Sequence, residues 1–371
     1  MAGQFRKISG TTSRRGANFL TALAQLALPN LSLLEIEVFF SKEFSAARVA
    51  SLLRAAARLD PLELSLIARV GVDDRDTAID VPCFARATSI YLVGLSFYLT
   101  LPEADGVGFP ALESLCISAC QFDTGALISR CPRLRTLQMR DCFIPDTIMV
   151  HSASIEELVV RRRHNRVCGI DVDAPLLKKF TLDAQMHPDF RLALLAPLVE
   201  NHSWDCFFGT GSQFYVQFAR NLQEMFPISS FSVLELRLET RGHVFGAMVL
   251  NLLRNCNAIQ KLKLVIERRE ETDEQCPPNC DCDQPQNWRS QNISLRILEE
   301  VEIENFKGSD HEVDFLKLLF RCAPLTKVIV KLTYKAARSS KGCKEIYHIF
   351  KANASVECYV YNKRGKEIMY T

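Results

Sequence analysis

Three cysteines in the carboxyl-terminal half of the chain are the residues best suited to metal chemistry. Cys276, Cys280 and Cys282 lie close together in a segment rich in charge and proline. Thiolates are preferred zinc ligands, and a structural zinc site commonly takes two pairs of ligands with two to four residues within each pair. Cys276 and Cys280 fit one such pair, and Cys282 is a third thiol. The spacing makes this segment the one candidate metal site of the sequence.

No second cysteine pair completes that set. A carboxylate or a histidine would have to supply the remaining ligand, and the nearest candidates are Asp281, Asp283 and His311. A loop of free thiols is the alternative interpretation. We therefore expect no cofactor, with these cysteines as the candidate if a metal binds.

Catalytic motifs are not found elsewhere. The sequence has no Gly-x-Ser-x-Gly elbow and no His-Glu-x-x-His pair. Gly106-x-Gly108 and Gly209-x-Gly211 lack the third glycine of a phosphate-binding loop. The seven histidines are dispersed, and no carboxylate pair suits general acid–base work. We predict that the protein is not an enzyme.

A repeated apolar spacing dominates the middle of the chain and must position any site. Four stretches share the pattern apolar-x-x-apolar-x-apolar, and their starts lie 22, 21 and 22 residues apart. That period is typical of leucine-rich repeats, whose consensus also has Asn or Cys at the turn, as at Cys120 and Cys142. The four stretches are Leu112–Ile117, Leu134–Met139, Ile155–Val160 and Leu177–Leu182.

Weaker copies extend the array in both directions. They begin at Leu31, Leu59, Ala87, Val233, Ile259, Leu298 and Leu325. Helix-like connectors run between copies, for example over 46–59 and 245–255. We predict an α/β leucine-rich-repeat solenoid, with a curved parallel sheet and a helical or irregular convex side. The expected division is an amino-terminal arm or capping helix over 1–27, repeats over 28–267, a charged insertion over 268–293 and a carboxyl-terminal cap over 294–371.

Residues between the core positions of each repeat are expected on the concave face, because side chains alternate along a strand. This face would bind a protein partner, with a basic edge continuing from Arg161 through Arg162 and Arg163 to Arg166. A solvated face without a dedicated partner is the alternative. The candidate partner-binding residues are Ser114, Cys116, Thr136, Gln138, Arg140, Val159, Arg161, Lys179 and Thr181.

The second half of the array carries alternating charges at the same positions. Lys261, Glu300 and Lys327 fall at equivalent strand positions, and so do Lys263 with Glu302, and Glu304 with Lys331. Adjacent parallel strands would join these charges into ladders of opposite sign. We expect this half to be structural and recognition to lie nearer residues 112–182.

The composition of the chain limits the classes of binding partner and the cellular compartment that we expect. Lys and Arg number 45 against 43 Asp and Glu, so no basic excess favours nucleic acid. The longest apolar stretches are too short to span a membrane, and we expect no membrane association. The 14 cysteines are scattered rather than concentrated in a short scaffold. We read them as reduced thiols of a cytoplasmic or nuclear protein.

Several longer stretches resemble a known family. They are Leu298-Glu-Glu-Val-Glu-Ile-Glu-Asn-Phe-Lys-Gly308, Phe315-Leu-Lys-Leu-Leu-Phe320, Ala323-Pro-Leu325, Ala352-Asn-Ala-Ser-Val356, Cys131-Pro-Arg-Leu-Arg-Thr-Leu137 and Ala174-Pro-Leu-Leu-Lys-Lys-Phe180. The first four resemble the FBD domain, and the last two resemble repeats, of plant F-box/FBD/leucine-rich-repeat proteins, especially those of grasses. The resemblance covers most of the chain from about Ala46 onward and makes 294–371 an FBD-like cap.

The resemblance implies a role in protein recognition. In this family an F-box docks on a Skp-type adaptor of a cullin ubiquitin ligase, and the repeats are thought to select the substrate. The Leu-Pro-Asp and Arg-Trp elements of an F-box are not found in residues 1–45. An F-box-less binding protein therefore stays an alternative, as does a receptor that holds a polyanion on the basic edge. The segment Cys282–Trp288 also resembles this family. The resemblance implies that Trp288 would fill the core as a structural plug, which is an alternative to a zinc site.

Overall fold

The computed structural model describes most of the chain in regular elements. The described residues are 4–11, 31–39, 46–69, 78–94, 98–101, 108–143, 147–207, 232–240, 243–255, 258–267, 280–283, 286–333, 341–362 and 364–368. The helices are α2 (Ala46–Leu59), α3 (Thr124–Ser129), α5 (Gly246–Asn255), α6 (Asp310–Cys322) and α7 (Lys341–Ala352), with 3-10 turns η2 (Asp281–Asp283) and η3 (Gln286–Ser290).

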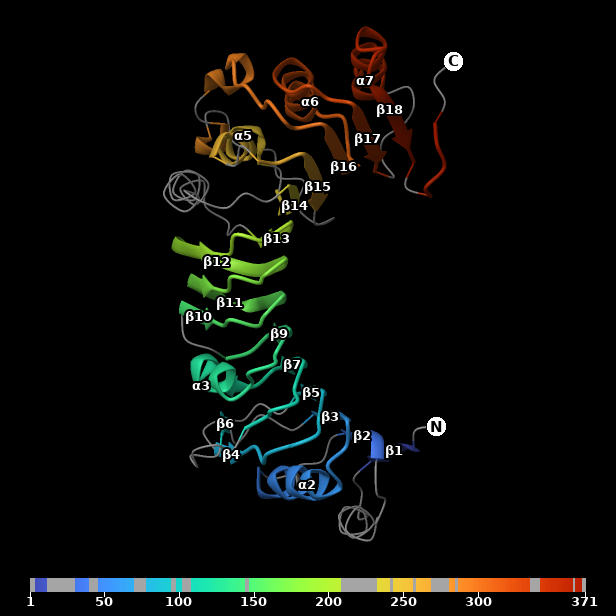
Figure 1. Cartoon of the computed structure of the whole chain (residues 1–371). Coiled ribbons are helices and arrows are strands. Elements are labelled where there is room, and N and C mark those ends of the chain that lie inside the picture. Colours follow the sequence, from blue (N-terminus) through green and yellow to red (C-terminus); the bar gives the residue numbers. More distant parts are fainter. Residues whose placement is uncertain are drawn as a thin grey trace. The chain divides into compact units, whose positions relative to one another are not determined.

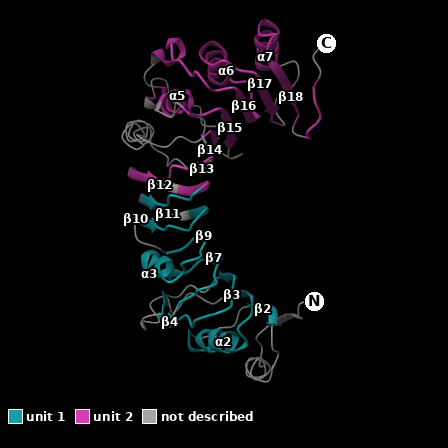
Figure 2. Ribbon diagram, in the orientation of Figure 1, with its two compact units in different colours: residues 1–164, 170–177 teal, residues 165–169, 178–371 magenta. Residues whose placement is uncertain are grey.

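The chain divides into two compact units, which Figure 2 distinguishes by colour. Unit 1 comprises residues 1–164 and 170–177, and unit 2 comprises residues 165–169 and 178–371. The strands of unit 1 are β1 (Gln4–Thr11), β2 (Leu31–Phe39), β3 (Glu63–Arg69), β4 (Ala78–Asp80), β5 (Ser89–Val93), β6 (Tyr98–Thr100), β7 (Ser114–Ser118), β8 (Gln121–Phe122), β9 (Thr136–Arg140), β10 (Thr147–His151) and most of β11 (Glu157–Asp173). Those of unit 2 are β12 (Lys179–Leu195), β13 (Asn201–Phe207), β14 (Val233–Glu239), β15 (Lys261–Glu267), β16 (Glu300–Phe306), β17 (Lys327–Leu332) and β18 (Glu357–Tyr361).

Each unit is built on parallel strands stacked in chain order. In unit 1 the order is β1-β2-β3-β5-β7-β9-β11, and a small sheet β4-β6-β8 lies beside it. In unit 2 the order is β12-β13-β14-β15-β16-β17-β18. The helices of each unit lie on one side of these strands (Figure 1). Parallel neighbours joined by crossovers are the arrangement that the repeat period predicts.

The apolar positions of the repeats form continuous buried rows. Leu115, Leu137 and Leu158 are neighbours in register across β7, β9 and β11, and each is at most 3% exposed. In unit 2, Leu262 and Val301 continue the same pattern. One repeat cannot bury its apolar side alone, so stacking is what removes these rows from water.

The turn that ends each strand is also repeated in unit 1. Gly94, Ala119 and Asp141 follow β5, β7 and β9, and all three have positive φ. Each donates its backbone N–H to a carbonyl of the next strand in the sheet, namely those of Ser118, Arg140 and Arg161, over 2.6–2.9 Å. The thiol of Cys142 donates to the carbonyls of Ile117 and Arg140, at 3.3 and 3.5 Å. The turn role expected for the repeat cysteine is thereby confirmed at this position.

Two weaker copies have a different phase from the one expected. Leu64, not Leu62, is the partner of Leu34, so the copy at residue 59 is displaced by two residues. Leu234 likewise takes the place expected for Leu236, opposite His202 of β13. A two-residue displacement keeps every side chain on its own face, so the apolar pattern alone does not distinguish these phases.

The connectors differ from the expected helices in the middle of the chain. Strands β11 and β12 each run for 17 residues, well past the length of a repeat strand. The alternation Ile170-Asp-Val-Asp173 within β11 is the signal of a half-buried strand. The expected helices at 46–59 and 245–255 are present as α2 and α5. Of the arm or capping helix expected over 1–27, residues 4–11 form β1, and the rest lies outside the described residues.

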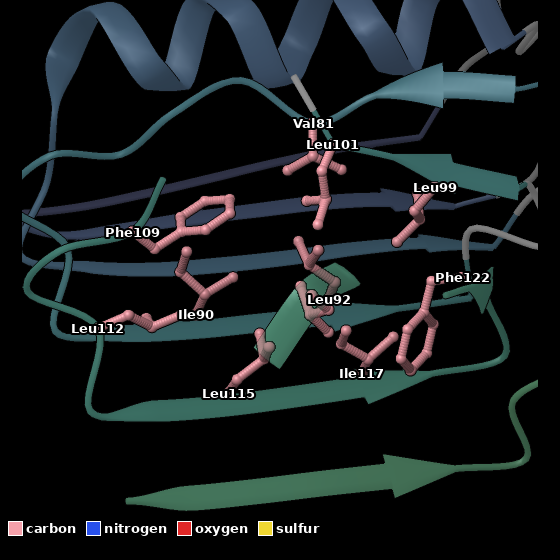
Figure 3. Close-up of a pocket in the computed structure, with 11 residues that line it drawn as sticks. Val81, Ile90, Leu92, Leu99, Leu101, Phe109, Leu112, Leu115, Ile117 and Phe122 are labelled. Atoms are coloured by element: carbon pink, nitrogen blue, oxygen red, sulfur yellow. The ribbon is translucent and has the colours of Figure 1, made fainter. Parts of the chain in front are cut away.

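A small apolar cavity lies in the core of unit 1 (Figure 3). Its volume is about 20 Å³, and its lining includes Val81, Leu92, Leu99, Phe109 and Phe122. That space is close to the volume of a single water molecule, and the lining offers no polar group to hold one. It is a gap between layers of core side chains and is not a ligand site.

Candidate functional site

The open face of unit 1 is the side of its sheet opposite α2 and α3 (Figure 1), and it is the candidate site. Three rows of outward side chains cross β7, β9 and β11. In register these rows are Ser114–Thr136–Glu157, Cys116–Gln138–Val159 and Ser118–Arg140–Arg161. Register brings together seven of the nine predicted partner-binding residues. Lys179 and Thr181 lie on β12 in unit 2.

Arg140 is the most constrained side chain of this face. Its guanidinium donates to Oε1 of Gln138 over 2.7 Å, so a neutral amide takes one of its N–H groups. Its Nε is buried and has no hydrogen-bond partner among the described residues. An unsatisfied buried donor costs about 1–3 kcal/mol.

Arg161 is the neighbour of Arg140 in the same row and is exposed. Parallel strands lie about 4.8 Å apart, so the bases of the two side chains are adjacent. Both positive charges act on Cys116, whose pKa is nevertheless raised because burial of the thiol outweighs them. The thiol is therefore not an activated nucleophile.

Two of the predicted contact residues are buried rather than accessible. Cys116 is 8% exposed and Val159 is 6% exposed. Both are short side chains next to Gln138 in register, and Cys116 also has Tyr91 as a neighbour. They form the floor of the face, and the longer polar side chains form its accessible surface.

The predicted basic edge is not continuous. Arg162 is 6% exposed and follows Arg161 on the same strand, so alternation turns it to the buried side. The side chain of Arg163 lies outside the described residues. Arg166 and Lys178 are exposed, and both belong to unit 2. The consecutive basic residues of the sequence therefore do not form one continuous basic surface.

The open face of unit 2 carries the expected charge ladder. Lys261 contacts Glu300 at 3.1 Å, across β15 and β16. Lys331 contacts both Glu302 at 2.6 Å and Glu304 at 2.8 Å. The hydrogen bonds that Lys331 donates to these two carboxylates raise its pKa to about 12.

Lys263 joins the ladder with partners other than the one predicted. It is the register neighbour of Glu302 but contacts Glu235 at 3.1 Å and Glu304 at 3.8 Å. For Glu304, burial raises the pKa, but hydrogen bonding from Lys331 and the charges of Lys263 and Lys331 outweigh it, so the pKa is lowered. The lysines and glutamates of this face therefore form ion pairs with one another.

The candidate metal ligands are only partly in the described chain. Cys276 lies outside the described residues, whereas Cys280 and Cys282 are buried near His243, which the sequence did not indicate. Two of the expected completing ligands have other partners. Asp283 accepts from Trp288 Nε1 at 2.7 Å, and the His311 ring packs edge-on against Phe245, 5.7 Å between centroids.

The stacked parallel strands are compatible with a leucine-rich-repeat solenoid. A family model described as "FBD-associated F-box protein At5g56370, LRR repeats" matches residues 49–194. The chain is also 26% identical over 132 residues to the F-box/FBD/LRR-repeat protein At1g80470 of Arabidopsis thaliana. That match covers 34% of this chain and 24% of the relative's length. No solved structure matches the chain significantly.

Both matches support the family that the sequence resembles, the plant F-box/FBD/leucine-rich-repeat proteins. Their repeats are protein-interaction modules, and the matched segment runs from within α2 to near the end of β12. The particular resemblance to proteins of grasses, the FBD-like cap and the domain boundaries stay predictions. Among the described residues, no helix is long and apolar enough to cross a membrane.

Proposed function

We propose that the chain recognises a protein substrate through the open face of unit 1, as the substrate-binding part of an SCF-type ubiquitin ligase. The observation that carries this proposal is the pair Arg140–Arg161, of which Arg140 holds a buried Nε without a partner in the described residues. Gln138 helps to fix one guanidinium in place. The floor of Cys116 and Val159 lies beside them.

The chemistry of this pair favours an acidic segment. Guanidinium groups bind carboxylates through parallel N–H···O bonds, which give direction as well as attraction. An Asp or Glu of the partner could accept from the terminal N–H groups of Arg140, and a second acidic residue could reach Arg161. The hydroxyl of Ser118 in the same row, and those of Ser114 and Thr136 two rows away, add adaptable hydrogen bonds along the segment.

A peptide-display selection on the immobilised chain tests this proposal, because a random library offers acidic, basic and neutral segments at once. The wild-type chain is expected to enrich acidic segments, and the double variant Arg140→Gln/Arg161→Gln is expected to lose that enrichment. The matched control is Lys261→Gln/Lys331→Gln, which removes the same charge from the ion-paired face of unit 2. Equal enrichment by wild type and the arginine variant would refute the proposal.

Adaptor binding tests the ligase half separately. The purified chain is mixed with a Skp-type adaptor and analysed by size exclusion and calorimetry. Micromolar or tighter binding supports a ligase receptor. Absence of binding would favour a recognition protein without an F-box. A thermal-shift measurement tests the third possibility, because a rise in melting temperature specific to inositol phosphates would favour the polyanion receptor.

A further inference from the structure

A cluster of two thiols and an imidazole lies in unit 2, away from the open face of the sheet. The ligand atoms of His243, Cys280 and Cys282 all lie within 4.8 Å of one another. His243 stands between β14 and α5, and the cysteines stand at η2. Cys280 is 9% exposed and Cys282 3% exposed. The chain thus brings together two elements that are 37 residues apart in sequence.

The one sulfur-to-nitrogen distance on which the site can be tested matches a tetrahedral zinc site. Zinc binds sulfur at about 2.3 Å and imidazole nitrogen at about 2.0–2.1 Å, so a tetrahedral angle places the two ligand atoms about 3.5 Å apart. The observed distance from Cys280 Sγ to His243 Nδ1 is 3.4 Å. The site therefore needs little rearrangement to accept the ion.

The backbone around each ligand is braced. The N–H of His243 donates to the carbonyl of Thr240 over 2.8 Å, and the N–H of Asp283 donates to the carbonyl of Cys280 over 3.1 Å. The Asp283 carboxylate in turn accepts from Trp288 and Arg289. Ligands held in this way lose little conformational freedom on binding.

The plug by Trp288 and the metal site do not exclude each other. Trp288 is 1% exposed, and a Cβ added to Gly246 at the start of α5 would collide with its ring. Arg289 extends the anchor to α6, with Nε 2.9 Å from the carboxylate of Asp314. The plug fixes the segment on the helices, and this leaves the two thiols beside His243.

We propose that His243, Cys280 and Cys282 bind a structural Zn²⁺ ion. The ion would cross-link the loop after β14 to η2 and so close the long connection between them. A metal clip of this kind stabilises the folded state because the unfolded chain has no preformed site. A water molecule would complete the coordination. This proposal is independent of the recognition function.

Metal analysis of the tag-free chain, purified in reductant, gives the first test. One zinc per chain is expected. After removal with a chelator, Co²⁺ is expected to produce the visible bands of a tetrahedral complex with sulfur-to-metal charge transfer, and Zn²⁺ should displace it. Zinc well below one per chain together with no cobalt bands would overturn the proposal.

Variants assign the ligands. Cys280→Ala, Cys282→Ala and His243→Gln are each expected to weaken zinc binding by more than about 100-fold, since changes outside the ligand set alone cost 10–100-fold. The matched control is Cys358→Ala on β18, whose thiol has its pKa raised to about 11 by burial and should not bind metal. Full retention of zinc by all three variants would refute the assignment even where wild type binds one ion.

Thiol counting separates the metal from a disulfide. A chain with zinc has both thiols after denaturation without reductant. Loss of two reactive thiols under those conditions would place a bond between Cys280 and Cys282 and would contradict the proposal. Circular dichroism of each variant shows whether loss of zinc follows loss of the ligand or loss of the fold.

Discussion

The open faces of the two units carry different chemistry on the same scaffold. In unit 2, cations and carboxylates alternate across the strands and contact one another, as Lys261 does with Glu300. In unit 1, β7 and β9 place serine, threonine, cysteine, glutamine and arginine outward, and no acidic residue stands among those six positions. Arg140 there bonds to the neutral amide of Gln138.

This difference separates stabilisation from recognition. A charge that already has a partner must lose it before it can bind anything else, so the ladder of unit 2 has little to offer a ligand. A guanidinium held by an amide keeps most of its attraction for a carboxylate. The buried rows are alike in both units, and the outward positions of their strands differ.

The largest expected effect is a loss of stability when the buried rows, which both units have, are truncated. Leu137→Ala in unit 1 and Leu264→Ala in unit 2 each remove a fully buried side chain from a core row. Each should lower the free energy of unfolding by about 2–5 kcal/mol, because the cavity adds to the lost transfer energy. Urea denaturation followed by circular dichroism measures both, with Gln138→Ala as the control of small effect. If the substitution in one unit lowered the free energy of unfolding by less than about 1 kcal/mol, the buried rows of the two units would not be equivalent.

Glycines on the helical side give the next effect, with opposite sign in the two units. A Cβ on Gly342 of α7 would collide with the backbone of Gly308, so Gly342→Ala should destabilise by about 1–3 kcal/mol. A Cβ on Gly125 of α3 meets its nearest atom, Asp123 Oδ1, at 3.5 Å. Gly125→Ala should therefore stabilise by about 0.5–1 kcal/mol. Thermal melting measures both, and equal signs would contradict the packing described here.

The charge ladder should contribute about 1 kcal/mol, and the contribution should depend on pH and salt. Lys331→Gln removes the shared partner of Glu302 and Glu304. Because the folded-state pKa of Glu304 lies below its ordinary value of 4.5, its stabilisation is present above pH 4.5 and is lost as the pH falls through the folded pKa. The folded-state pKa of Lys331 is raised to about 12, so its share is present below pH 10.5 and is lost as the pH rises through 12.

Unfolding of wild type and Lys331→Gln at several pH values measures this difference. The gap between the two should be widest near neutral pH and should shrink below pH 4.5 and in high salt. Arg140→Gln on unit 1 is the matched control and should leave the acid limb unchanged. A gap that persists at low pH would show that Lys331 stabilises through packing and not through charge.

The sequence predicts the repeats well where the apolar spacing is strong. The stretches from Leu112 to Leu182 supply buried rows in the expected phase, because stacking requires the same positions in each unit. The copies near Leu62 and Leu236 were displaced by two residues, since alternation repeats every two residues along a strand. Local pattern therefore fixes the face but not the register.

The sites were less predictable for a related reason. Strand alternation identified Arg140 and Arg161, but it did not indicate that Cys116 and Val159 would be covered. His243 is 37 residues from Cys280, and only the fold brings them together. Contacts of that kind leave no signal in spacing.

The smallest expected effect on stability is the most informative for the comparison. Arg140→Gln/Arg161→Gln should change the free energy of unfolding by no more than about 0.5 kcal/mol, because Arg161 is exposed and Arg140 is half-buried, and substitutions at such surface positions have small effects. Removal of the unsatisfied Arg140 Nε offsets loss of its bond to Gln138. The same variant should lose binding of acidic segments, whereas Lys261→Gln/Lys331→Gln should lose stability and keep binding. If the arginine pair instead costs as much stability as Lys331, the open face of unit 1 is a structural surface like that of unit 2.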